Sequence, residues 1–124
     1  MAPYHQGKAL AVDFWDCAVP IGTGQSMCVP AGCFNGVLRT NEWGPLDPAG
    51  GIQAKLYAPG TGLIKIFELG NAAGEFLELT RIRSLGRDQR EEANDQALRL
   101  DGRGYRFGGP AYAATAHAVC QQFC

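Results

Sequence analysis

Five cysteines are the residues of this 124-residue chain that could carry nucleophilic or metal chemistry. They are Cys17, Cys28, Cys33, Cys120 and Cys124. Zinc sites favour short paired spacings such as Cys-x2-Cys, and these cysteines are spaced more widely. A disulfide between two of the first three cysteines, or buried free thiols, is the better interpretation. We therefore expect no metal and no other cofactor.

The histidines, His5 and His117, both lie near an end of the chain. Cys120 follows His117 by three residues, a spacing that on a helix could pair an imidazole with a thiol and activate it. No pattern in the sequence supplies a third catalytic group or an oxyanion hole, so a solvent-exposed imidazole is the better interpretation. A cysteine-dependent enzyme remains the alternative to a protein without catalytic activity.

Charged residues give no sign of a polyanion or membrane site. Four arginines lie close together at Arg81, Arg83, Arg87 and Arg90, but the acidic residues among them allow ordinary surface pairing. The net charge of -1 gives no electrostatic reason to expect nucleic acid as a partner. No apolar run is long enough for a membrane span.

Four aromatic residues are the candidates for ligand binding: Trp43, Tyr57, Trp15 and Phe67. If they point to one side of a curved sheet, they form a concave aromatic lining of the kind that binds apolar molecules or sugar faces. The alternative is that they form the sheet core, covered by the helix expected near residues 88–101. We expect a non-enzymatic binding or interaction module. A structural fragment without activity of its own is a further alternative.

The elements that must position these residues are mostly strands. Apolar residues make up 46% of the chain and charged residues 19%, and frequent Gly and Pro would punctuate short strands. Residues 34–43 form an extended run, and 44–51 are too rich in Gly and Pro to continue it. Residues 53–58 and 63–69 flank Pro-Gly-Thr-Gly and predict a β-hairpin. A further strand is expected over 75–83.

The remaining segments are less regular. Residues 9–15 fit either a short helix or a strand, and the Gly and Pro breaks over 17–32 leave room only for a short strand near 27–29. Asp88 is a candidate N-cap for a helix over 88–101, and 103–124 are expected to form a loosely packed C-terminal segment. The predicted fold class is α+β, mainly β. It comprises a single domain, 1–124, with a curved antiparallel meander or half-barrel of about five strands and one helix.

Residues 29–82 carry a specific set of motifs. They are Val29-Pro30-Ala31-Gly32-x-Phe34, Thr40-x-Glu42-Trp43-x-Pro45-Leu46 and Tyr57-Ala58-Pro59-Gly60-x-Gly62-Leu63. In these motifs the chain resembles a family of uncharacterised bacterial proteins, often exported, whose outline is similar to bacterial lipoprotein-carrier half-barrels. The resemblance implies a strongly curved antiparallel sheet and no known reaction.

The resemblance also bears on the start of the chain. Relatives look as if they carry further strands and an export signal ahead of the region beginning near Tyr4, so Met1 is expected to lie inside a domain. The sheet would then present an unpaired edge, and we expect a homodimer through that edge. The chain as given begins without a secretory signal and on that basis predicts a cytoplasmic protein, whereas the resemblance implies export of the parent protein.

Overall fold

The computed structural model describes residues 1–70 and 74–113. They form two compact units, one spanning Met1–Ile82 and one beginning at Arg83. The first unit contains a β-sheet and the second a long helix. The predicted class, α+β and mainly β, is therefore confirmed, while the single-domain organisation stays a prediction.

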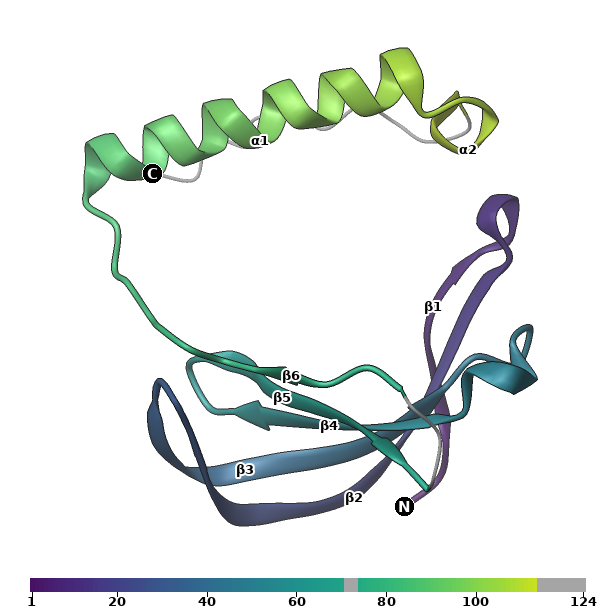
Figure 1. Ribbon diagram of the computed structural model, residues 1–124, viewed down its shortest axis with the longest axis vertical. Helices are drawn as coiled ribbons and strands as arrows, with labels where there is room; N and C mark the ends of the chain where they lie inside the picture. Colours follow the sequence, from purple (N-terminus) through teal and green to yellow (C-terminus); the bar gives the residue numbers. More distant parts are fainter. Residues whose placement is uncertain (71–73, 114–124) are drawn as a thin grey trace. The chain divides into compact units, whose positions relative to one another are not determined.

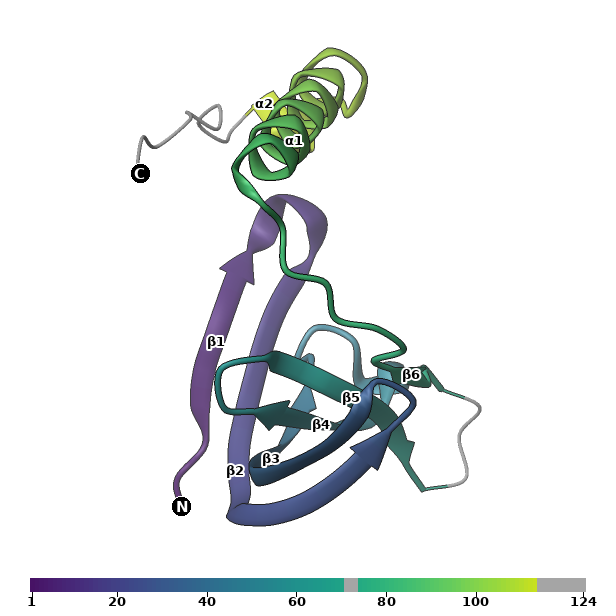
Figure 2. The same cartoon turned by 90° about the vertical axis from the view of Figure 1, so that its left-hand side faces the viewer.

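The sheet has six strands in the order in which they occur along the chain. They are β1 (Tyr4–Ala9), β2 (Phe14–Val29), β3 (Gly32–Trp43), β4 (Ile52–Ala58), β5 (Gly62–Leu69) and β6 (Leu77–Glu78). Each strand pairs with the next in antiparallel orientation, which makes the sheet a meander (Figures 1 and 2). The sheet is open and not strongly curled, so the strong curvature expected of a half-barrel is not seen.

The β4–β5 hairpin is confirmed where the sequence predicts it. Ala58 pairs with Gly62, and the Thr61 amide donates to the Ala58 carbonyl at 3.1 Å. Gly60 and Gly62 have φ angles of 71° and 95°, which residues with a Cβ rarely adopt. The Pro-Gly-Thr-Gly segment therefore makes the reversal because its glycines accept positive φ.

Strand β2 corrects the prediction for the front of the chain. It runs for 16 residues through Pro20, Gly22 and Gly24, where the Gly and Pro pattern predicts only a short strand near 27–29. The pairing with β3 shifts register between Pro20 and Gly22, between Gly22 and Gln25, and between Gln25 and Met27. Such irregularities accommodate Pro and Gly in a ladder, because they interrupt regular pairing where a donor or a side chain is missing.

Two further boundaries differ from the prediction. Residues 9–15 are neither one helix nor one strand: β1 ends at Ala9, a 3₁₀ turn (η1) covers Leu10–Val12, and β2 begins at Phe14. The strand expected over 75–83 is reduced to the two residues of β6. With the extra strand β1, the sheet has one strand more than the five expected.

The buried core of the sheet unit is aliphatic. Val37, Leu56 and Ile64 are the largest apolar side chains that are fully buried, and Val29 and Ala58 pack with them. Phe67 packs against the edge of this cluster and is partly buried. Trp43, Tyr57 and Trp15 are not part of it.

One disulfide closes the β2–β3 hairpin. Cys28 and Cys33 are a directly opposed cross-strand pair and form the bond, while Cys17 is a buried free thiol. The expectation of a disulfide between two of the first three cysteines is confirmed. Cys120, Cys124 and His117 lie outside the described residues.

The second unit contains α1 (Arg87–Phe107) and a short α2 (Pro110–Ala113). The helix predicted over 88–101 is confirmed but extends further, to Phe107. The N-cap is Gly86 rather than Asp88, and the Gly86 amide donates to the Gln89 side chain at 3.2 Å. No side chain of α1 is buried. Among the described residues, no helix combines the length and apolar character that a membrane-spanning helix needs.

Candidate functional site

The end of strand β3 defines two faces of the sheet. Trp43 is opposite Cys17 of β2, and Glu42 is opposite Ala18. Because successive side chains of a strand point to opposite faces, Trp43 and Glu42 lie on different faces. We call the face that carries Trp43 the aromatic face and the other the Glu42 face.

Trp15 and Phe67 also lie on the aromatic face. Trp15 precedes the β2 partner of Trp43 by two residues and so shares its face. Phe67 pairs with Ala54, which pairs with Asn41, two residues before Trp43. The structure thus places three of the four candidate aromatic residues on one side of the sheet.

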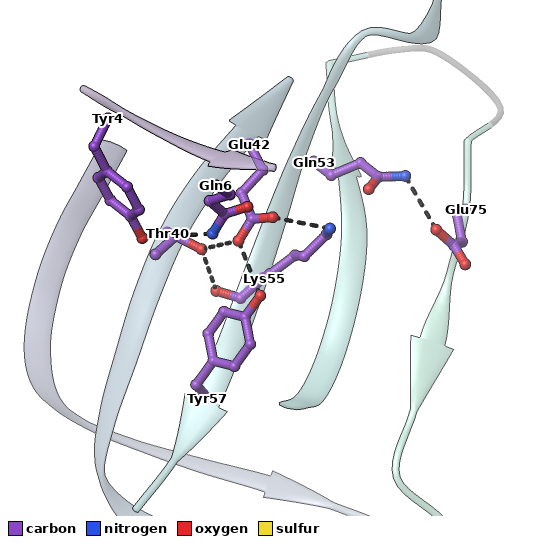
Figure 3. Close-up of polar contacts among 8 residues, drawn as sticks. All are labelled: Tyr4, Gln6, Thr40, Glu42, Gln53, Lys55, Tyr57 and Glu75. Carbon is purple, nitrogen blue, oxygen red and sulfur yellow. Dashed lines mark hydrogen bonds and ion pairs between the residues drawn. The ribbon is translucent and has the colours of Figure 1, made fainter. Parts of the chain in front are cut away.

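Tyr57 lies on the opposite side. It pairs with Leu38, which shares the face of Glu42, and its hydroxyl donates to Glu42 Oε1 at 2.9 Å (Figure 3). Tyr57 therefore cannot join the other aromatic side chains in one lining. The register of β3 against β4 fixes this side, and a shift of one residue would reverse it.

Trp43 lines an apolar pocket of about 330 Å³ beside the loop that joins β3 to β4. Pro48 and Ile52 contribute further apolar walls, and Asp47 lies at the rim. The loop contains a 3₁₀ turn, η2 (Pro48–Gly50), which is capped because the Asp47 side chain accepts from the Gly50 amide at 3.2 Å. The loop that reads as a break in the sequence is thus an ordered wall of this pocket.

A second, more polar cleft of about 310 Å³ adjoins the apolar pocket. Trp43 and Asp47 line both hollows, and Trp15 of β2 lines the cleft. Asp16 and Lys55 supply charged groups to the same cleft. Two of the four predicted residues, Trp43 and Trp15, therefore meet at one hollowed end of the sheet, whereas Phe67 lies further along the aromatic face.

A hydrogen-bonded network occupies the Glu42 face (Figure 3). Glu42 is 2% exposed. Its carboxylate accepts from Thr40 Oγ1 at 2.6 Å and from Tyr57, and Lys55 Nζ lies 2.9 Å from Oε2. Burial alone would raise the pKa of Glu42, but these three donors outweigh it and hold the pKa below its ordinary value. Glu42 is thus an ionised, fully bonded carboxylate.

The pKa values of the neighbouring Tyr57 and Asp16 are raised, in contrast to that of Glu42. Burial, and then the hydrogen bond to Glu42, raise the pKa of Tyr57, so its hydroxyl stays a proton donor. Burial also raises the pKa of Asp16, and Glu42 adds to this, while Lys55 partly offsets both. Both oxygens of Glu42 are bonded within the network, which fits a structural role more than a reacting one. Glu42 and Lys55 also line the polar cleft beside Trp15 and Trp43.

The structure brings together a cysteine and a histidine that sequence reasoning left apart. Cys17 Sγ lies 3.4 Å from His5 Nδ1, and the Trp15 indole N–H donates to the same nitrogen at 2.7 Å. His5 and Cys17 are opposed in the β1–β2 ladder. Since Nδ1 already accepts from Trp15, the imidazole is not well placed to take the thiol proton, and Cys17 is only 6% exposed.

Arg39 is a second residue that the sequence analysis did not single out as part of a site. The alternation along residues 37–43 already places it on the same side as Trp43, which was the signal available. The His5–Cys17 contact carried no such signal, because it depends on cross-strand register. Within the described residues, no group of three or more Cys, His, Asp or Glu side chains could hold a metal ion.

Comparisons of the chain with family models, with curated proteins and with solved structures found no match. The resemblance of residues 29–82 to exported bacterial half-barrel proteins therefore stays a prediction.

Proposed function

We propose that the protein is a non-enzymatic binding module that takes a small apolar molecule on the aromatic face, at the end marked by Trp43. The observation that carries the proposal is the apolar pocket of about 330 Å³ formed by Trp43, Pro48 and Ile52. Pockets of this size, with apolar walls and a few polar groups at the rim, are typical of small-ligand sites.

The aromatic face continues the apolar surface away from the pocket. Ile52 pairs with Leu69, and the next row contains Ala54 and Phe67. Leu69 and Phe67 are partly exposed, so these rows are not sealed within the core of the sheet unit. A ligand seated at Trp43 can therefore extend along the strands without displacing buried residues.

The Glu42 network lies on the opposite face of the strands that carry this site and stabilises their pairing. Its bonds join Glu42 and Thr40 of β3 to Lys55 and Tyr57 of β4. These bonds hold the two central strands in register on the side away from the ligand. A rigid scaffold of this kind loses less conformational entropy when a ligand binds, so binding costs less free energy.

The test uses 1-decanol, an uncharged apolar probe, with binding measured by isothermal titration calorimetry. Trp43→Ala should weaken binding roughly tenfold or more, because a large aromatic wall is lost, and should lower the unfolding temperature less severely. Phe76→Ala is the matched control, since Phe76 is 64% exposed and lines neither hollow. Undetectable decanol binding to the wild-type protein would refute the proposal.

If Trp43→Ala unfolds the sheet, Trp43 is a core residue as the alternative interpretation holds. Trp43→Phe then separates the two roles, because it keeps an aromatic ring in the wall. Preserved folding together with weakened decanol binding supports the binding role, and unchanged binding counts against it.

The contact between Cys17 and His5 is the observation that favours the second candidate, a cysteine-dependent enzyme. Alkylation of Cys17 with iodoacetamide across a range of pH tests it, because an activated thiolate reacts well below the pH at which an ordinary thiol does. Slow alkylation that rises only at alkaline pH removes this candidate.

A homodimer through strand β1 is the proposed form of association. β1 is an end strand of the sheet and, among the described residues, pairs only with β2. A second copy could add a strand to this edge by backbone hydrogen bonding. Sedimentation at micromolar concentration checks it, and a purely monomeric mass would contradict it.

A further inference from the structure

We propose that Arg39 binds the carboxylate of an aliphatic acid whose chain lies along the aromatic face toward Trp43. This inference rests on the proposed function, because it identifies the chemical class of the same ligand. It begins from the surroundings of Arg39, a partly buried residue of β3 whose row on the aromatic face contains Leu56 and Lys65.

The guanidinium of Arg39 has few protein partners. Its Cζ lies 5.7 Å from the centre of the Phe67 ring, and Nη2 donates to Asn41 Oδ1 at a long 3.4 Å. The Nε atom is buried and has no hydrogen-bond partner. Among residues 1–70 and 74–113, no carboxylate forms an ion pair with Arg39.

Two acidic residues in the same part of the sheet, Glu78 and Glu68, do not pair with Arg39. Glu78 is already paired with Lys65 at 2.7 Å. Glu68 has an unpartnered oxygen, but it pairs with Gln53 and so lies on the Glu42 face, away from Arg39. In the part of the chain that the structure describes, the positive charge of Arg39 thus lies in a partly desolvated position without an acidic partner.

A carboxylate matches this position in charge and shape. A guanidinium offers parallel N–H groups that meet both oxygens of a carboxylate, and the bond is strengthened where water is partly excluded. The Phe67 ring lies near the guanidinium, and among the described residues Nη1 has no hydrogen-bond acceptor.

The distance to the pocket sets the shape of the ligand. Arg39 and Trp43 are four residues apart on one face of β3, which is about 13 Å at about 3.3 Å per residue. The row between them contains Asn41, Ala54 and Phe67. Ala54 is small and fully buried, so its side chain does not project above the sheet surface. A linear chain with an acid at one end can therefore reach the Trp43 pocket while its carboxylate contacts Arg39.

The experiment compares three probes of equal chain length: decanoate, 1-decanol and decylamine. Each is titrated into the full chain by calorimetry at neutral pH and low salt. We expect decanoate to bind roughly tenfold more tightly than decanol, as for a charge-assisted hydrogen bond, and decylamine to bind more weakly than either. In Arg39→Gln the preference for decanoate over decanol should disappear.

Two further variants make the outcome specific. Arg81→Gln removes an exposed arginine elsewhere in the sheet unit and should keep the preference for decanoate. Arg39→Lys keeps the charge but loses the planar fork, so an intermediate preference is expected. If Arg39→Gln fails to fold by circular dichroism, Arg39→Lys alone decides, and an unaltered preference in it would contradict bidentate recognition.

The outcomes separate this inference from the proposed function. Decanol binding without any preference for decanoate overturns the role of Arg39 and leaves the binding module standing. A preference that survives in Arg39→Gln places the carboxylate elsewhere and overturns the inference as well. Absence of binding for all three probes overturns both.

Discussion

Lys55 Nζ lies 2.9 Å from Glu42 Oε2, and this ion pair joins the two central strands of the sheet on the face opposite Trp43. Glu42 is 2% exposed and Lys55 20% exposed at their side chains. A pair in such a position is costly to break from one side, because the remaining charge keeps its burial but loses its partner.

Glu42→Gln should therefore lower the free energy of unfolding by about 2–3 kcal/mol, as measured by urea denaturation. The matched control is Glu91→Gln, which disrupts the exposed Arg87–Glu91 pair. That change should cost about 0.5 kcal/mol or less. Equal effects of the two substitutions would show that the Glu42 network contributes no more than a surface pair.

The two carboxyl groups near Lys55 should make opposite contributions to stability against pH. The pKa of Glu42 is lowered in the folded state, so its stabilisation is present above the ordinary carboxyl pKa and is lost as the pH falls through the folded value. In Glu42→Gln the free energy of unfolding should fall less steeply on acidification than in the wild-type protein. An equally steep fall of the free energy of unfolding in both proteins would contradict this prediction.

The pKa of Asp16 is raised by burial and by Glu42. Its contribution to stability therefore has the opposite sign to that of Glu42. Folding then favours the protonated form, so Asp16 destabilises the folded state once the pH exceeds its ordinary pKa. We expect Asp16→Asn to raise the free energy of unfolding at neutral pH and to have less effect near pH 3. A loss of stability at neutral pH would mean that Asp16 makes a favourable contact with Lys55 that outweighs its burial.

The disulfide of the β2–β3 hairpin closes a short loop, with a sequence separation of 5 between Cys28 and Cys33. Loop-closure entropy for about six residues corresponds to about 2 kcal/mol. Replacing both cysteines by serine should lower the free energy of unfolding by about that amount. Addition of reductant to the wild-type protein should reproduce the loss, and no change in either case would show that the bond is dispensable for the sheet.

Two glycines of α1 provide a matched pair in the second unit. A Cβ at Gly102 would meet no atom within 4 Å, whereas one at Gly104 would come within 2.5 Å of the Tyr112 ring. Gly102→Ala should stabilise the helix by about 1 kcal/mol, and Gly104→Ala should not, because Tyr112 must move. Urea denaturation followed by the helical signal at 222 nm checks both, and equal gains would place Tyr112 elsewhere.

Local patterns were enough to predict several elements of this fold. The β4–β5 hairpin and helix α1 lie where Gly, Pro and helical spacing indicate them, because such signals act within a few residues. The alternation of side chains along β3 is a local pattern of the same kind, and it places Arg39 and Trp43 on one side of the sheet. The aliphatic core is not predicted, because the burial of Val37 and Leu56 depends on how the strands pack and not on a local pattern.

Features that depend on pairing between strands could not be predicted in the same way. The side taken by Tyr57 follows from its pairing with Leu38, which no local pattern specifies. Likewise the His5–Cys17 contact needs the β1–β2 register, and β1 was not recognised as a strand. Strand β2 was missed because Pro20 and Gly22 read as breaks, although shifts of register let the ladder continue past them.

The meander order has a consequence for how the sheet forms. Among the described residues every strand pairs with its neighbour in the chain, so no strand pairing has to wait for a distant strand. The entropy lost in closing each loop stays small, and proteins built from local contacts fold faster than those built from distant pairings. The sheet can therefore grow one hairpin at a time from either end, and the residues that bracket the Trp43 pocket, in β3, its following loop and β4, come together in one such step.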